Sequence, residues 1–441
     1  SEFHKSTMLT ANGYRMVENH VSARKTPSML SLCGDERFFE NQAFGKFSRA
    51  ACDTFMMLDR LSHKTFDSDK ETKFLESFFD VNGPSFDSIG TLYPTSSALF
   101  KGFERNVTGL FDELTKAPES FVRYEEVLGM MLENERQNAA KTSKSEWTSG
   151  VFTIKDNSMS IKDRKRFESA IKLAGFSPSA FVHENTAAMV YSSMDRPDSD
   201  TQQKEEDVLV INVGSMATKL SLVRVEYVPN GDPKANSTRW HPSVTGTKDF
   251  HSTAFSGHLL DVCLADYALA KQIKNMKREV GKNEITLHKR RRLYNDIKKT
   301  KEMLSANKEV TFNVEDFFDD RPLNVKLSRA EFEEACEPLF TTFESMIVDF
   351  LFQINRDNLK KVEIIGGSVR VPKVQEILRE KFKLQLSMTI NGDEGAAHGA
   401  AFISANTTTG LKIKKIYMND GPNYKVDLDI TFPTDPTAKP K

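Results

Sequence analysis

The sequence predicts an α/β fold in which strands are followed by glycine-rich turns and helix starts. Residues 362–382 read as a short apolar run, a Gly-Gly-Ser turn and a helix-like pattern. Residues 208–225 hold two β-branched runs around a Gly-Ser turn, and residues 391–402 follow an acidic start with small residues. A strand, a glycine turn and a helix start can hold a nucleotide against exposed amides, which makes a nucleotide the candidate ligand.

The segment at 362–382 is predicted to be a buried strand followed by a helix. An apolar run ending at Ile365 suits a buried strand, and Gly366 and Gly367 let the backbone come close to a ligand. Pro372 follows the turn, where helices tolerate proline. The apolar residues beyond the turn recur at helical spacing, so one face should pack on the sheet: Val371, Val374, Ile377, Leu378 and Phe382. Taken alone, the pattern also fits an ordinary strand-to-helix turn of any α/β protein.

Two further segments agree with this interpretation. Residues 208–225 have the pattern of a β-hairpin. Residues 391–402 predict a small-residue helix able to approach a sheet closely. With residues 293–307, these blocks resemble the nucleotide-binding domain of the seventy-kilodalton heat-shock chaperone superfamily, in the same order and at similar spacings over nearly the whole chain.

The resemblance implies a bilobal, actin-like α/β fold with a nucleotide cleft between two lobes. It places the nucleotide-binding domain at residues 1–408, with lobe I at 1–183 and 369–408 and lobe II at 184–368. Residues 409–441 look like the linker and the start of a substrate-binding β-domain. The opening residues look like the tail of a first phosphate loop whose Asp-Leu-Gly would precede residue 1.

Four short segments are most similar to the large endoplasmic-reticulum branch of the superfamily, that of the 170-kilodalton glucose-regulated protein. They are residues 24–27, 36–39, 125–130 and 304–307. The cytosolic 110-kilodalton branch fits less well.

The resemblance implies a degraded phosphate end of the cleft. Phosphoryl transfer needs positioned water, a cation and positive charge on the leaving phosphates. Asn212 replaces the acidic residue that opens the second phosphate loop. Gly214 is kept, whereas Ser215, Met216 and Ala217 replace Gly-Gly-Thr. We expect the Met216 side chain to crowd amides that would face phosphate.

Other departures lie outside that loop. Lys219 replaces an acidic residue of the same hairpin, Asp59 replaces a lysine of the first lobe, and Lys155 replaces the proline that relays nucleotide state. Glu184 survives at a position implicated in metal and water placement, but is insufficient alone. We therefore treat Asn212, Glu184 and Asp59 as degenerate catalytic positions and assign no metal ligand.

The adenosine end matches the family better. Lys301 and Ser305 match a ribose contact and a base contact, although Glu302 replaces a stacking arginine and Lys298 replaces a ribose-binding glutamate. Arg370 is placed to stack its guanidinium on adenine. The residues expected to bind the nucleotide are Gly214, Ser215, Gly257, Lys301, Ser305, Gly366, Gly367, Ser368, Arg370, Val371 and Asp393. The implied cofactor is ATP or ADP, and the accompanying Mg²⁺ is left open.

Composition limits the partners and the compartment. The 441 residues are 39% hydrophobic, enough for a real core, and 61 basic residues balance 62 acidic ones. The net charge of −1 therefore gives no overall field for nucleic acid or an anionic membrane. Four scattered cysteines lack metal or redox spacing, so isolated thiols are expected: Cys33, Cys52, Cys263 and Cys336. Residues 106–108, 236–238 and 406–408 are glycosylation sequons if the protein is lumenal.

The resemblance implies a domain that binds adenine nucleotide with little or no hydrolysis. It would act as a nucleotide-exchange factor for a conventional lumenal heat-shock chaperone, and as a holdase for unfolded polypeptides through domains outside this chain. Neither a nucleic-acid partner nor a membrane partner is expected. Two alternatives stay open: an active ATP-hydrolysing chaperone ATPase, and a structural holdase platform with an empty cleft. The expected location is the endoplasmic-reticulum lumen, with the cytoplasm as the alternative.

Overall fold

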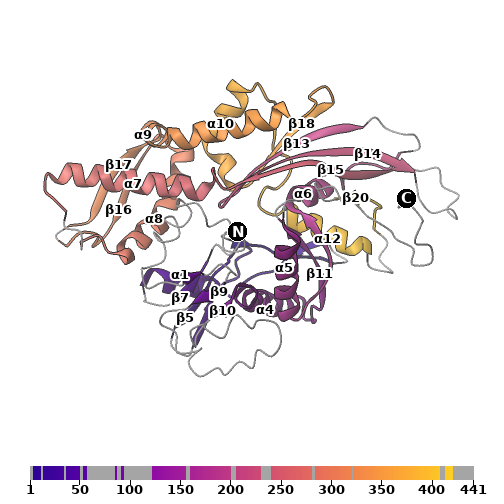
Figure 1. Ribbon diagram of the computed structural model, residues 1–441, viewed down its shortest axis with the longest axis horizontal. Helices are drawn as coiled ribbons and strands as arrows, with labels where there is room; N and C mark the ends of the chain where they lie inside the picture. Colours follow the sequence, from indigo (N-terminus) through magenta and orange to yellow (C-terminus); the bar gives the residue numbers. More distant parts are fainter. Residues whose placement is uncertain are drawn as a thin grey trace, which may run out of the picture.

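The computed structural model describes residues 3–10, 13–33, 36–49, 53–56, 85–86, 91–93, 122–154, 159–199, 205–229, 240–280, 284–319, 321–407 and 413–420. Within them the chain is a mixed α/β fold with two regions on either side of a cavity (Figure 1). The first region holds the N-terminal strands and helices α1, α4 and α5; the second holds the long sheet and helices α7 to α10. The predicted fold class is therefore confirmed.

The second region is built around a six-stranded sheet with the order β19-β18-β13-β14-β15-β20. Its strands are β13 (Glu206–Val213), β14 (Thr218–Pro229), β15 (Trp240–Ser252), β18 (Leu359–Ile365), β19 (Leu386–Ser387) and β20 (Tyr417–Asn419). β13 and β14 form the predicted antiparallel hairpin, and β18 lies parallel to β13. β13 is buried at every position after its first, as expected for a strand covered on both faces.

Helices and a small hairpin extend this region. They are α7 (Gly257–Met276), α8 (Leu287–Ala306), β16 (Glu309–Val314), β17 (Leu323–Ser328), α9 (Arg329–Ala335) and α10 (Glu337–Phe352). Phe255, Phe340 and Phe343 are fully buried in their core. A disulfide joins Cys263 of α7 to Cys336 at the junction of α9 and α10. Cys33 is also disulfide-bonded, so the expectation of isolated thiols was wrong.

The helical pattern predicted after the Gly-Gly-Ser turn is confirmed, but it is divided into short elements. A 3₁₀ turn, η3 (Gly367–Arg370), leads into α11 (Pro372–Glu376) and a π turn, η4 (Ile377–Lys381). Val371, Val374, Ile377 and Leu378 are buried, and Phe382 packs against the same core.

The first region combines small sheets with helices. Its elements are β1 (Phe3–His4), β2 (Thr7–Thr10), β3 (Gly13–Met16), β4 (Thr26–Pro27), β5 (Leu30–Cys33), β6 (Glu36–Phe39), α1 (Glu40–Arg49), β7 (Asp53–Phe55), β8 (Ser85–Phe86), β9 (Thr91–Tyr93), β10 (Val122–Arg123), α4 (Tyr124–Ser143), β11 (Ser149–Ile154), α5 (Ile161–Leu173) and β12 (Ser177–His183). β11 and β12 pair in parallel, and α4 packs against α5.

The small-residue helix α12 (Gly395–Thr407) makes its closest approach to a helix rather than to a sheet. A Cβ added at Gly399 would lie 1.8 Å from the Ala187 carbonyl oxygen of α6 (Glu184–Ser192). Glycine is therefore required at this helix crossing. Helix α12 also contacts β11 and β2, so the predicted approach to strands is present beside the closer crossing with α6.

Candidate functional site

A cavity of about 1280 Å³ brings together segments that are far apart in the sequence. Ten of the expected nucleotide-binding residues line it: Gly214, Ser215, Gly257, Lys301, Ser305, Gly367, Ser368, Arg370, Val371 and Asp393. Gly366 lies beside Gly367 but does not face the cavity. Asn212 and Glu184 also line it, whereas Asp59 and Lys155 fall outside the residues that the structure describes.

Two glycines allow the turns around the cavity to pack closely. Gly366 has a φ of 90°, and a Cβ there would lie 2.4 Å from the Val213 carbonyl oxygen. At Gly257 an added Cβ would lie 2.1 Å from the Ser368 hydroxyl oxygen. A side chain at either position would displace the turn between β13 and β14 (residues 214–217) or the turn after β18. By contrast, a Cβ at Gly367 would meet nothing within 4 Å, so this glycine opens onto space.

The β13–β14 hairpin builds the end of the cavity where phosphate is expected, which we call the phosphate end. The Gly214 amide donates to the Ala217 carbonyl at 2.9 Å, which closes the turn. Asn212 and Lys219 flank it as directly paired residues, so their side chains lie side by side on one face. Glu184 lies beside both of them and is the first residue of α6, where the helix N-terminus favours negative charge.

These three side chains form one connected group. The Lys219 ammonium makes an ion pair with Glu184, and the Asn212 amide donates to the other Glu184 oxygen at 3.3 Å. Burial acts to raise the pKa of Glu184, but the Lys219 charge and these hydrogen bonds hold it below its usual value. Glu184 is thus an ionised carboxylate whose charge Lys219 balances.

The Asn212 amide is held in one orientation. Its nitrogen also donates to Asn185 Oδ1 at 3.0 Å, and the Asn185 amide donates to the Ser221 hydroxyl at 2.8 Å. Both amide protons of Asn212 are therefore used inside the protein. An aspartate at this position could donate neither hydrogen bond and would set a second negative charge beside Glu184.

Met216 and Ala217 are only 3% and 6% exposed, and Met216 belongs to the hydrophobic core. Both also line the cavity. The crowding of phosphate-facing amides by Met216 stays a prediction, because most of its side chain packs inward.

The end of the cavity where adenosine is expected, which we call the adenosine end, is lined by α7, α8 and the turn after β18. Lys301 of α8 donates to the Gly257 carbonyl at 2.7 Å and pairs with Asp261 Oδ1 at 2.7 Å. Burial raises the pKa of Asp261 to about 6, against the opposing effect of the Lys301 charge. Asp261 was not singled out in the sequence. Its position one helical turn after Gly257, on the same face of a helix, was the available signal.

Other groups at this end remain close to the cavity. Ser305 Oγ donates to the Lys301 carbonyl at 3.2 Å, and the exposed Arg370 pairs with Asp393 at 3.0 Å. Burial, and then the neighbouring Lys301 charge, lowers the pKa of Lys298 to about 8. The expected ribose and base residues therefore share one wall.

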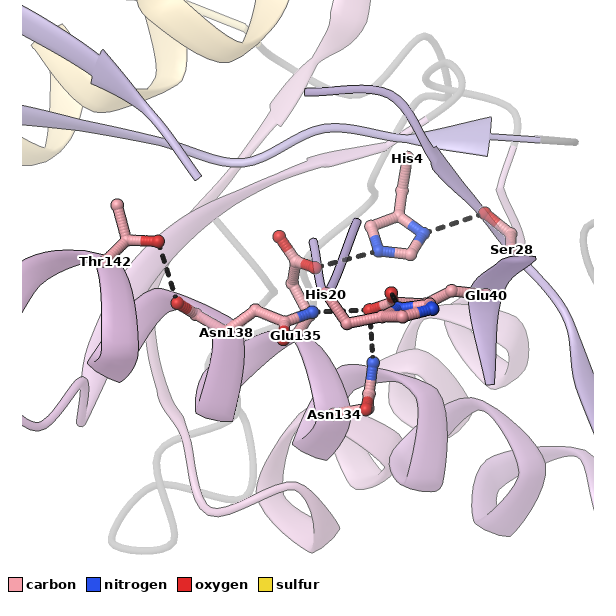
Figure 2. A network of polar contacts seen from close by, with 8 residues as sticks. All are labelled: His4, His20, Ser28, Glu40, Asn134, Glu135, Asn138 and Thr142. Carbon is pink, nitrogen blue, oxygen red and sulfur yellow. Dashed lines mark hydrogen bonds and ion pairs between the residues drawn. The ribbon is translucent and has the colours of Figure 1, made fainter. Parts of the chain in front are cut away.

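A partly buried polar network joins the N-terminal segment to helix α4, as Figure 2 shows. His4, which lines the cavity, hydrogen-bonds Glu135 at 3.1 Å and Ser28 at 3.0 Å. Glu40, at the start of α1, accepts from Asn134 at 2.6 Å and from the Asn138 amide and His20. Burial acts to raise the pKa of Glu135, but hydrogen bonds led by that of His4 lower it overall. The network fixes the strand from which Lys5 and Ser6 reach the cavity.

The C-terminal segment reaches the base of the helix that carries Glu184. β20 pairs with β15, and the Asp420 carboxylate that follows is buried. It accepts from the His183 amide, the His183 ring and the Thr186 hydroxyl, the last at 3.0 Å. Asp420 thereby caps the N-terminus of α6. The sequence did not predict this contact.

Three carboxylates of the cavity wall are already paired and are not free to bind Mg²⁺. Magnesium is normally bound through one or two free carboxylates together with substrate phosphates. Glu184, Asp261 and Asp393 each already pair with a lysine or arginine of this chain. Among the described residues, no group of three or more His, Cys, Asp or Glu side chains is arranged to hold a metal ion.

Comparison with known proteins gives one consistent result. A profile of the Hsp70 protein family matches residues 112–431. "Hypoxia up-regulated protein 1" of Danio rerio is 27% identical over 424 residues, which cover 95% of this chain and 40% of that protein. Its Xenopus laevis counterpart is 27% identical over 425 residues, or 94% and 60%. "Heat shock 70 kDa protein 4L" of Homo sapiens is 25% identical over 423 residues, or 95% and 46%.

These relatives confirm the resemblance to the large branch of the superfamily. The chain spans between 40% and 60% of their length. Within the described segments, none of the helices combines the length and apolar character that a membrane crossing requires.

Proposed function

Because the chain belongs to the Hsp70 family, we propose that it holds adenine nucleotide in the cleft with little or no hydrolysis. The observation that carries this proposal is the contrast within one cavity. Lys301, Ser305 and Arg370 line its adenosine end, while Glu184 at the phosphate end is neutralised by Lys219. The first set supports binding, and the second leaves no free acid to position water or metal.

A thermal-shift titration with ATP and ADP tests nucleotide binding. A ligand that binds only the folded state stabilises it by about 2.7 kcal/mol at a hundred times its dissociation constant. We expect both nucleotides to raise the melting temperature. An unmoved melting curve at saturating concentrations would favour the structural platform with an empty cleft.

We further propose that the domain accelerates ADP release from a conventional lumenal heat-shock chaperone, and that the whole protein is a holdase. The similarity to the large branch supports this role. Nucleotide-facing residues kept beside a degraded phosphate site favour a function other than ATP hydrolysis. A bound nucleotide would hold the two regions in one arrangement and stabilise a docking surface.

Stopped-flow release of fluorescent ADP from the partner chaperone tests the exchange role. The domain should accelerate release in proportion to its concentration. Gly367→Trp should fill the adenosine end without a backbone clash, since this position opens onto space. The variant should accelerate ADP release less than the wild type, while its circular dichroism spectrum stays unchanged. If the wild-type domain leaves the ADP release rate unchanged at every domain concentration, the exchange role is excluded.

We propose the endoplasmic-reticulum lumen as the location. The Cys263–Cys336 disulfide supports this, because disulfides persist in oxidising compartments and are rare in the cytosol. Asn406 of the 406–408 sequon is exposed at the end of α12 and available for modification. An endoglycosidase-sensitive shift that Asn406→Gln removes would support the lumen; the sequons at 106 and 236 lie outside the described residues.

A further inference from the structure

We propose that the Lys219 ammonium serves as a built-in cation at the phosphate end, so that this cleft binds nucleotide phosphates without a divalent metal. The proposal rests on the proposed binding of adenine nucleotide and adds that this binding does not require Mg²⁺. It assigns Lys219 as the residue that determines this property.

Lys219 lies where it can reach a phosphate group in the cavity. Its register opposite Asn212 places it beside the turn formed by 214–217, whose residues line the cavity. Its side chain is only 16% exposed and also lines the cavity. An ammonium is a compact point charge that binds phosphate well, and partial removal from water strengthens its interaction with a second charge.

The charges of Lys219 and Glu184 balance each other. Glu184 is the carboxylate nearest to Lys219, and the two already form an ion pair. A Mg²⁺ ion placed here would meet the Lys219 positive charge and a carboxylate that is already neutralised. The Lys219 ammonium has three N–H donors, and its hydrogen bond to Glu184 still lets it donate to a phosphate oxygen. The pair therefore offers N–H groups to an anion and no free carboxylate to a metal.

The hydrogen bonds of Asn212 suit the Lys219–Glu184 pair. It donates to Glu184 and to Asn185, which an aspartate could not do. An acidic residue at 212 would add a negative charge about 3.3 Å from Glu184, and such a pair would need a cation between its members. The three side chains thus form a neutral, hydrogen-bonded set that needs no added ion.

Calorimetric titration of the full chain with ATP and ADP, in Mg²⁺ and in EDTA, tests the proposal. The wild type should bind with dissociation constants that agree within about threefold in the two buffers, since the difference would be well under one charged hydrogen bond. Affinity that appears only with Mg²⁺ would overturn the proposal while leaving nucleotide binding intact. No binding in either buffer would overturn the proposed function itself.

Two substitutions at Lys219 identify the source of the effect. Lys219→Met keeps the length of the side chain and removes its charge, so affinity for ATP and ADP in EDTA should fall about tenfold to a hundredfold. Lys219→Asp should weaken binding in EDTA by at least as much and recover it with Mg²⁺. If Lys219→Met binds ATP in EDTA as tightly as the wild type, the ammonium has no role.

Lys326→Met provides the matched control. Lys326 pairs with Glu309 on the β16–β17 hairpin and does not line the cavity, so its loss removes an ion pair without affecting nucleotide affinity. A second readout is independent of nucleotide: Lys219→Asp should gain Mn²⁺ binding by electron paramagnetic resonance, because carboxylates suit this ion. Mn²⁺ binding by the wild type at the same level would contradict the proposal.

Discussion

The two ends of the cavity each contain a lysine–carboxylate pair, yet the pairs have opposite consequences. At the adenosine end, Asp261 holds Lys301, a residue type that the family uses there, beside the Gly257 carbonyl. At the phosphate end, Lys219 neutralises Glu184 and occupies a position that is acidic in the family. In the proposed function the first pair places a binding group, whereas the second neutralises a charge that hydrolysis would require.

The comparison teaches that binding and catalysis depend on different properties of the same cleft. Binding would rely on backbone shape and several redundant contacts, so we expect it to tolerate Lys298 and Glu302 in place of the family's glutamate and arginine. Catalysis relies on a few charges aimed at the reacting atoms, each of which is worth several kcal/mol of transition-state stabilisation. Changes at only a few positions can therefore end turnover and leave the ligand site in place.

The largest expected effect concerns turnover. Asn212, Ala217 and Lys219 lie where the resemblance expects oriented catalytic groups, and each such loss costs about a hundred- to a thousandfold in rate. Single-turnover phosphate release should stay near the uncatalysed background. Asn212→Asp alone should restore little, because Lys219 still neutralises Glu184. Hydrolysis by the wild type at the rate of an active family member would show that the two ends do not differ as described.

The second prediction tests the turn that joins the two ends. Gly366→Ala places a Cβ against the Val213 carbonyl and the Asn212 amide at a φ of 90°. It should lower the free energy of unfolding by roughly 2–4 kcal/mol. Gly367→Ala is the adjacent control and should change it by less than about 0.5 kcal/mol, because its Cβ meets open space. Equal urea midpoints for the two variants would contradict the described geometry.

The third prediction uses the raised pKa of Asp261. Because the folded state holds this proton up to about pH 6 and the unfolded state releases it near 3.8, the protonated acid stabilises the fold at low pH. That contribution, roughly 1–3 kcal/mol, should be lost as the pH rises from 4 to 6. Asp261→Asn should remove this part of the pH dependence in urea unfolding. A variant with the wild-type pH profile would show that Asp261 does not titrate as described.

The smallest expected effect belongs to Ser305. Ser305→Ala removes one hydrogen-bonding group from the adenosine wall, which corresponds to about 1 kcal/mol, or a several-fold loss of nucleotide affinity. Ser404→Ala, a cavity-lining hydroxyl on α12, is the control and should leave affinity unchanged. Equal losses in both variants would place the base elsewhere in the cavity.

Local patterns in the sequence predicted much of the framework. The hairpin at 208–225, the glycines at 366 and 367 and the buried face from Val371 to Leu378 follow from short-range spacing and are present in the structure. These features depend on neighbours within a few residues, which is where periodicity is informative.

Contacts between distant segments could not be predicted in the same way. The Cys263–Cys336 disulfide spans 73 residues, and Asp261 meets Lys301 only because α7 packs on α8. The Asp420 cap of α6 links positions 234 residues apart. Lys219 was recognised as a departure from the family, but its pairing with Glu184 required the three-dimensional arrangement.

One measurement tests the central claim most directly: isothermal titration of the full chain with adenosine, ADP and ATP under one buffer condition. The account predicts that adenosine binds measurably and that ADP and ATP bind within about tenfold of each other, since little at the phosphate end distinguishes the last phosphate. Binding of ATP alone, with no heat from adenosine and at least a hundredfold weaker ADP, would contradict it, because the phosphate end would then dominate recognition.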